Sequence, residues 1–189
     1  PYENDWFAGT LTLENAHAPE LLPWGGAHLR VLGENTVDGT LGGTGLLFTG
    51  GGSLAAGELS VWSWGSVRAP LLVVRDGTDV RCGALHMGSN AEEKGTLLVE
   101  SGSLTADGEF WLQNAALTVT GGELTLAGDA SIDRGEVHIS GGTVSFEHGL
   151  WLGEGDIVIT GGTVIVPGGE AGLTAENGKV TISGGAVRE

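Results

Sequence analysis

The chain has 189 residues, of which 36 are glycine, 5 are proline and 40% are hydrophobic. This length predicts one domain with a substantial core, and the glycine content argues against helices, because each glycine in a helix interior costs about 1 kcal/mol. The formal net charge of −16, with only 8 Lys and Arg, excludes a basic phosphate-binding surface, so we expect neither a nucleic-acid partner nor binding to an anionic membrane.

The single cysteine, Cys82, permits neither an internal disulfide nor a cluster of thiolates around a metal, and we expect it to be a small core residue. No long apolar run occurs, so we expect no segment inserted in a membrane. The sequence starts at Pro1 rather than at a methionine and opens with no signal-like segment. We therefore expect residues 1–189 to be a single domain excised from a longer protein.

Short apolar alternations in the N-terminal half predict strands that bury one face. The first strands of successive coils are expected at Leu11/Leu13, Leu29/Val31, Leu46/Phe48 and Leu71/Val73. A motif of two apolar residues around a variable one, followed by glycine, ends a coil in "WFAG" from Trp6, "LPWG" from Leu22, "WSWG" from Trp62 and "LHMG" from Leu85. We expect Trp24, Trp62 and Trp64 to lie in the core, because they occupy apolar positions of this motif.

From Thr96 the pattern becomes a regular repeat of about 20 residues, in blocks that begin at Thr96, Ala116, Glu136, Asp156 and, incompletely, Lys179. The first alternation in these blocks is Leu97/Val99, Leu117/Val119, Val137/Ile139, Ile157/Ile159 and Val180/Ile182. The second begins at Leu104, Leu124, Val144, Val164 and Val187, and the third is Phe110/Leu112, Ala130/Ile132, Leu150/Leu152 and Ala171/Leu173. Such short strands cannot bury a face alone, so we expect each block to stack on the next.

A glycine pair follows the first alternation, at Gly121-Gly122, Gly141-Gly142, Gly161-Gly162 and Gly184-Gly185. Glycine permits the positive φ and the close backbone approach that a corner between short strands needs. Corners stacked at the strand spacing of about 4.8 Å make a parallel β-solenoid. We predict an all-β, right-handed parallel β-solenoid of about nine coils of roughly 20 residues, with three short strands per coil and loops around residues 66–70 and 88–95.

Three copies of the repeat, "VHISGGTV", "IVITGGTV" and "VTISGGAV", resemble the glycine-rich repeats of bacterial surface and autotransporter-type passenger proteins. Those proteins are right-handed parallel β-helices and share their architecture with the pectin-lyase-like enzymes. The resemblance covers the C-terminal half and, more loosely, the N-terminal half. It implies an exported protein with adhesive, scaffold or carbohydrate-related duties, in the extracellular space or at the bacterial cell surface.

The middle residue of each third strand faces outward if its two neighbours face the core. This places Trp111 and Trp151 in one outward column, with Ser131 between them and His86 below. Indoles two coils apart lie about 9.6 Å from each other, a separation at which a flat polysaccharide can stack on both. We expect Trp111, Trp151 and His86 to bind a glycan; the alternative is that the indoles pack under a side loop or against a neighbouring module.

Two polar clusters are candidates for catalysis. Asp107, Glu109, Asp129, Glu147 and His148 gather at the corner before the third strand. Paired carboxylates about 5 to 9 Å apart cleave glycosidic bonds, although acids also meet by chance in so acidic a chain. The second cluster, Arg75, Asp76, Asp79, Arg81 and His86, has the residue types of a β-elimination lyase and equally those of a surface ion-pair network.

The sequence therefore leaves two function classes open. The first is a non-enzymatic structural or adhesive module of an exported bacterial surface protein, with a polysaccharide or cell-surface glycan as its ligand. The alternative is a carbohydrate-active β-helix enzyme, a polysaccharide lyase or glycoside hydrolase. The five histidines show no metal-ligand spacing, so we expect no metal and no cofactor. Unpaired strand edges at the solenoid ends predict contact with adjacent modules of the parent protein or self-association.

Overall fold

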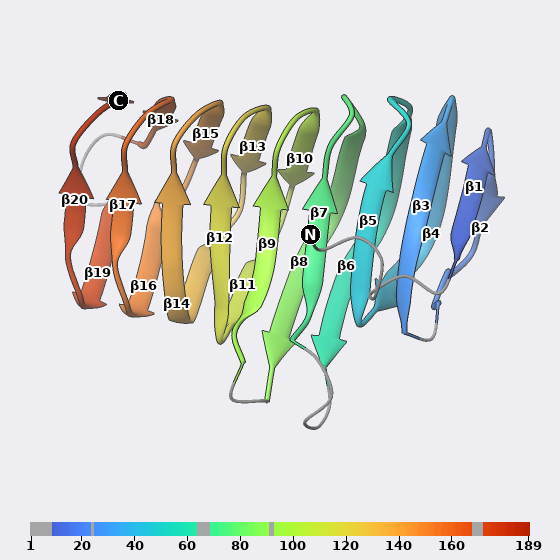
Figure 1. The fold of residues 1–189 in the computed structure, drawn as a ribbon, viewed down its shortest axis with the longest axis horizontal. Helices are drawn as coiled ribbons and strands as arrows, with labels where there is room; N and C mark the ends of the chain where they lie inside the picture. The colour runs from blue at the N-terminus through green and yellow to red at the C-terminus, as the bar shows by residue number, and fades with distance from the viewer. Residues whose placement is uncertain (1–8, 24, 64–68, 91–92, 168–171) are drawn as a thin grey trace.

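The computed structural model describes residues 9–23, 25–63, 69–90, 93–167 and 172–189, which form a parallel β-solenoid without a helix. The predicted all-β class is confirmed. In Figure 1 the strands nearest the viewer point up, those behind them point down, and the chain advances from right to left, which makes the coil right-handed. Among the described residues, no helix is long and apolar enough to span a membrane.

Each complete coil contributes a first, a second and a third strand. The first strands are β1 (Thr10–Glu14), β3 (Gly26–Leu32), β5 (Gly45–Thr49), β7 (Leu71–Val74), β9 (Gly95–Val99), β12 (Ala115–Val119), the end of β14 (Ala130–Ile139), β17 (Ile157–Ile159) and β20 (Val180–Ile182). The second strands are β2 (His17–Ala18), the starts of β4 (Glu34–Gly43), β6 (Ser53–Ser63) and β8 (Asp79–Ser89), and then β10 (Ser103–Ala106), β13 (Glu123–Leu126), β15 (Thr143–Phe146), β18 (Thr163–Ile165) and β21 (Ala186–Arg188). The third strands are the ends of β4, β6 and β8, then β11 (Phe110–Gln113), the start of β14, β16 (Leu150–Glu154) and β19 (Leu173–Asn177). We call the outward surfaces of these three sets the first-strand, second-strand and third-strand faces.

The described strands make about eight turns, and β20 and β21 begin a further coil (Figure 1). The predicted stack of about nine coils matches this count, because the last coil is incomplete. The prediction of a loop around residues 88–95 needs a small correction, since β8 continues through Ser89. The predicted positions of Trp6, Trp24 and Trp64 lie outside the described residues.

Glycines at the corner between first and second strands adopt a backbone conformation that other residues avoid. Gly122, Gly142, Gly162 and Gly185 have φ values of 68°, 72°, 75° and 75°. A β-carbon added to Gly142 would collide with the carbonyl oxygen of Gly122 on the previous coil. The same carbonyl accepts the N–H of Thr143 at 2.9 Å, so the corner needs glycine both for its φ and for its close contact.

The inward side chains of all three strand sets form one continuous core along the stack. Leu104, Leu124 and Val144 are fully buried and lie opposite one another in the register, as the repeat predicts. Equivalent inward positions at the end of the stack are open, with 40% of Val180 and 54% of Ile182 exposed. Burial in this fold therefore comes from the neighbouring coils.

The assignment of Leu71 and Val73 to the core is wrong. Leu72 and Val74 face the core with no exposed surface, whereas Leu71 and Val73 face outward and form a small second cluster with Leu47. All residues of β7 are apolar, so alternation along this strand cannot distinguish its two faces.

The expected alignment of neighbouring coils is also wrong at two places. Leu29 lies opposite Phe48 rather than Leu46, because the chain uses two more residues for this coil than the alternation suggests. In the last complete coil, Leu150 lies opposite Leu173, so the third strand there begins two residues later than expected. The apolar pattern does not define the number of residues between the strands of these two coils.

Leu22 differs from its predicted inward position. Leu21 forms the isolated bridge to Leu41 of β4, and 47% of Leu22 is exposed. The apolar–glycine motif "LPWG" therefore does not mark a third strand with two inward residues, since its proline also removes a backbone donor.

Replacing Gly142 tests the stacked corner. We expect Gly142→Ala to lower the free energy of unfolding by about 3 kcal/mol, because it combines an unfavourable positive φ with a collision against the backbone of Gly122. Gly77→Ala is the matched control, since Gly77 has a φ of 71° but open space where its β-carbon would be. The control should cost about 1 kcal/mol in urea denaturation. Equal losses would contradict the close contact between corners.

Burial of Cys82 predicts an unreactive thiol. Burial, with smaller contributions from the charges of Asp107 and Glu58, raises the pKa of Cys82 from 9.0 to about 12. In mildly alkaline buffer the native thiolate fraction should be about a thousandfold below that of the unfolded chain, and labelling by a disulfide reagent should slow accordingly. The native and urea-unfolded proteins are compared with the same reagent. Rapid labelling of the native protein would contradict the burial of this side chain.

Candidate functional site

The middle residues of the third strands form one outward column along the solenoid. The register places Ser60, His86, Trp111, Ser131, Trp151 and Thr174 opposite one another on successive coils. The predicted order of His86, Trp111, Ser131 and Trp151 is therefore confirmed. Trp111 is half-buried, and 41% of Trp151 is exposed. We call these residues the outward column.

Trp62 does not lie in the core, in contrast to its prediction. Val61 and Ser63 point inward and are buried, so Trp62 points outward beside the outward column. Its ring centroid lies 5.4 Å from that of Trp111, and the two ring planes are tilted by 50°. Trp62 and Trp111 therefore form an aromatic pair on the third-strand face.

Glycine makes the contact of Trp62 with Trp111 sterically accessible. Trp62 lies opposite Gly88 on the next coil, and a β-carbon added to Gly88 would fall 2.8 Å from Cη2 of the indole. Gly153, two residues after Trp151 on the same strand, also leaves room for an indole, with 2.7 Å between its added β-carbon and Cη2 of Trp151. The indoles of Trp62 and Trp151 thus each lie over a glycine.

The position of Trp62 could have been predicted by aligning the coils from the glycine that precedes each third strand. The stretch "GELSVWS" at residues 57–63 matches "GALHMGS" at residues 83–89 in its glycine, leucine and final serine. This alignment places Trp62 at the position of Gly88, as the structure does. The motif ending in glycine gave a different alignment because "WSWG" begins three residues after Leu59, the residue that lies opposite Leu85.

His86 lies between two carboxylates, opposite Trp111 on the preceding coil. Its Nδ1 is 3.1 Å from Oε1 of Glu58, and its Nε2 is 3.3 Å from Oε2 of Glu109. Its ring meets that of Trp111 edge to face, with 6.3 Å between centroids. The two acids carry more charge than one imidazolium can neutralise, so this trio is negative in either protonation state of His86.

A second carboxylate–imidazole pair lies beside Trp151. Nδ1 of His148 is 3.3 Å from Oδ1 of Asp129, and both side chains are largely exposed. Asp129, His148, Trp151 and Thr174 line a hollow of about 300 Å³. Each of the two outward-column tryptophans therefore has an acidic group and a histidine close to it.

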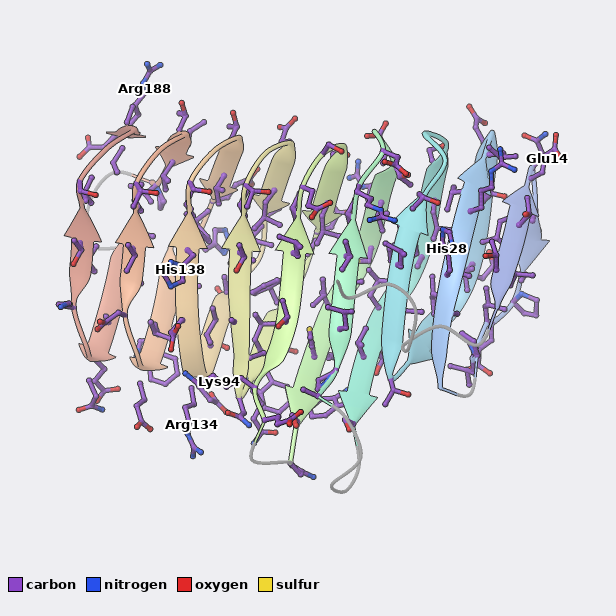
Figure 2. The ribbon with its side chains drawn as sticks, in the orientation of Figure 1. Glu14, His28, Lys94, Arg134, His138 and Arg188 are labelled. Atoms are coloured by element: carbon purple, nitrogen blue, oxygen red, sulfur yellow. The ribbon has the colours of Figure 1, made fainter. Side chains whose placement is uncertain are left out.

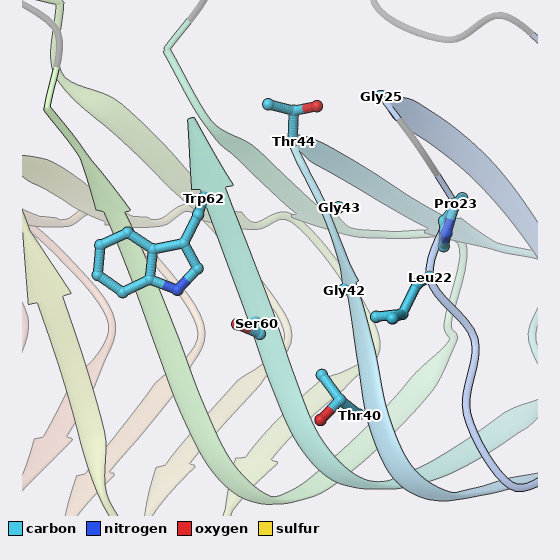
Figure 3. A pocket seen from close by; sticks show the side chains of 9 residues that line it. All are labelled: Leu22, Pro23, Gly25, Thr40, Gly42, Gly43, Thr44, Ser60 and Trp62. Atoms are coloured by element: carbon cyan, nitrogen blue, oxygen red, sulfur yellow. The ribbon is translucent and has the colours of Figure 1, made fainter. Parts of the chain in front are cut away.

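A larger hollow lies at the other end of the third-strand face. It has a volume of about 400 Å³, with Trp62 on one side and Leu22 and Pro23 on the other (Figure 3). Its floor is low because Gly42 and Gly43 contribute no side chains there. Gly42 lies opposite Ser60, so this hollow continues the line of the outward column.

The predicted corner cluster separates into pairs. Nε of Arg81 is 2.7 Å from Oδ2 of Asp107, which raises the pKa of the guanidinium through hydrogen bonding and charge. Glu109 turns instead to His86, and Asp129 to His148. The corner thus consists of exposed ion and hydrogen-bonded pairs on adjacent coils.

The second predicted cluster, between Arg75 and His86, is divided over two faces. Asp79 accepts a hydrogen bond from Oγ of Ser103 at 2.9 Å, and Arg81 binds Asp107, both on the second-strand face. His86 lies on the third-strand face. Asp76 has a φ of 58° and belongs to the turn predicted at Asp76-Gly77. In the part of the chain that the structure describes, no group of three or more His, Cys, Asp or Glu is placed to hold a metal ion.

Comparison with known proteins gives no relative: no family model, no curated protein and no solved structure matches the chain. The class of protein therefore follows from its geometry, a parallel β-solenoid with an outward aromatic column on one face.

The contact between Trp62 and Trp111 predicts a spectroscopic signal. Two indoles this close and tilted should couple and give an exciton couplet in ultraviolet circular dichroism. We expect Trp62→Phe to abolish the couplet, whereas Trp151→Phe should leave it in place. A couplet that survives Trp62→Phe would show that the pair does not form.

Proposed function

We propose that this chain is a non-enzymatic structural or adhesive module of an exported bacterial surface protein and binds a glycan on its third-strand face. The observation that supports this most directly is the alignment of Trp111 and Trp151 with only Ser131 between them. Indoles present a flat apolar ring with a hydrogen-bond donor at its edge, which suits stacking against sugar rings.

The solenoid is a suitable scaffold for such a site. The outward residues of successive coils are fixed at the strand spacing of about 4.8 Å by the backbone ladder, so they lose little freedom when a ligand binds. Trp111 is further held by its contacts with Trp62 and His86. A linear polymer laid along the solenoid axis would meet the indoles of Trp111 and Trp151, two coils apart.

The surface location is supported by the resemblance of the "SGGTV"-type repeats to passenger-protein repeats and by the acidic composition. A net charge of −16 favours solubility and disfavours association with nucleic acid. Neither observation depends on the tryptophans, so location and ligand binding are separate parts of the proposal.

The strands at the two ends of the solenoid support the proposed structural role of the chain. Val180 and Ile182 of β20 expose apolar side chains at one end, and 42% of Leu11 of β1 is exposed at the other. Open edges of parallel strands offer unpaired backbone groups to a further strand. We propose that adjacent modules of the parent protein, or a second copy of the chain, pair with these edges.

Glycan binding is tested on an array of polysaccharides, followed by calorimetry with those that bind. We expect Trp111→Ala/Trp151→Ala to weaken binding by about a hundredfold, because stacking on each indole contributes about 1 to 1.5 kcal/mol. The matched control is Thr118→Ala/Val158→Ala, which removes two outward side chains two coils apart on the first-strand face. The control should bind like the wild type.

Binding that survives the tryptophan double variant would refute the aromatic surface as the site. The alternative, a carbohydrate-active enzyme, predicts release of reducing ends or of unsaturated sugars from the same polysaccharides. Sustained product release by the wild type would replace the proposed binding function with catalysis.

A further inference from the structure

We propose that the third-strand face binds a polymer of amino sugars, whose protonated amines meet the carboxylates beside the tryptophans. This inference depends on the proposed glycan-binding function and names the chemical class of its ligand. It combines the aromatic column with the distribution of charge around it.

Carboxylates stand next to the aromatic pair. Glu58 and Glu109 lie two residues before the outward-column residues Ser60 and Trp111, and both point toward His86 on the coil between them. About two-thirds of the Glu109 side chain is exposed, so its carboxylate can reach a ligand that lies on the indole. The trio of two acids and one imidazole is negative whichever protonation state His86 takes.

A second acid lies beside Trp151, the tryptophan two coils beyond Trp111 in the outward column. Asp129 lies beside Trp151, and 95% of its side chain is exposed. Its partner His148 lines the same hollow. An acid thus lies close to each tryptophan of the outward column, and Glu109 and Asp129 lie on adjacent coils, two residues before Trp111 and Ser131.

Cationic side chains of the described residues lie away from this line. Arg81 lies on the second-strand face and Arg134 lies where third strands turn into first strands, and they face the acids Asp107 and Glu154 respectively. Figure 2 shows Arg134 and Lys94 at the lower edge of the solenoid, where third strands turn into first strands. Lys94 in turn pairs with Glu136 at 2.8 Å.

This distribution selects against an acidic polysaccharide. A uronic acid lying on the indoles would meet Glu58, Glu109 and Asp129 at close range, and the described Lys and Arg side chains lie away from this line, in a chain of net charge −16. A protonated amino sugar gains the same stacking and adds ion pairs and cation–π contacts. Charge therefore favours the cationic ligand where stacking alone would not distinguish the two.

The line of the site follows the solenoid axis. From Ser60 to Thr174 the outward column crosses five intervals between coils, which is about 24 Å at the strand spacing. The hollow between Leu22 and Trp62 lies at one end of this line (Figure 3). A linear oligomer of several sugars would contact both indole positions and both acidic groups.

The test is calorimetry with three soluble oligomers of equal length: glucosamine, N-acetylglucosamine and galacturonic acid, in a mildly acidic buffer of low salt. N-acetylglucosamine keeps the ring and removes the charge. We expect the glucosamine oligomer to bind about tenfold more tightly than the N-acetyl oligomer, and the galacturonic acid oligomer to bind more weakly than either.

Two charge variants test which carboxylates cause the preference for the glucosamine oligomer. Glu58→Gln/Glu109→Gln should reduce the preference for glucosamine about fivefold and leave the affinity for the N-acetyl oligomer unchanged. Glu34→Gln/Glu123→Gln changes the net charge equally on the second-strand face and should leave the preference intact. Melting temperatures close to that of the wild type would show that both variants remain folded.

The outcomes separate this inference from the function on which it depends. Equal affinity for the glucosamine and N-acetyl oligomers, a preference for galacturonic acid, or an equal effect of both charge variants would overturn the amino-sugar assignment and leave glycan binding standing. Absence of binding by any oligomer or polysaccharide would overturn both. Preference for glucosamine that depends on Glu58 and Glu109 would support both.

Discussion

The parallel backbone ladder between successive coils is the interaction on which the rest of the structure depends. It fixes each residue opposite a partner on the next coil, and it can form only where the corner permits the two chains to approach closely. Gly142 meets this condition through its φ of 72° and its contact with Gly122. Once the ladder is in place, alternation sends half of the side chains into a shared core and arranges the other half in straight outward columns.

The sequence predicts the positions of residues most accurately where the coils have a constant length. From Thr96 to Leu152 equivalent residues are 20 apart, and the predicted inward positions and the line from Trp111 to Trp151 are correct. In the N-terminal half the spacing varies, and β7 is apolar on both faces, so the apolar pattern alone misplaces Leu71 and Trp62. The glycines that precede the third strands, Gly57 and Gly83, would have given the correct alignment, because they mark where those strands begin.

In the candidate site, too, the sequence predicts some features and not others. The sequence places Trp111, Trp151 and His86 in one column, since that depends only on alternation and period. The sequence cannot show that Glu58 and Glu109 both contact His86. These residues are 28 and 23 positions from His86, and the contacts depend on the side-chain conformations. The aromatic pair, the acids and the hollow over Gly42 and Gly43 are the features on which the proposed preference for a cationic ligand depends.

The register of the third strands in the irregular half is the central claim, and disulfide trapping tests it directly. In a Cys82→Ala background, the account predicts that Ser60→Cys/His86→Cys forms an intramolecular disulfide under mild oxidation, because Ser60 lies opposite His86. The alternative alignment, in which "WSWG" is the third strand, places Ser63 opposite His86 instead. Efficient cross-linking of Ser63→Cys/His86→Cys, with none for the Ser60 pair, would contradict the account.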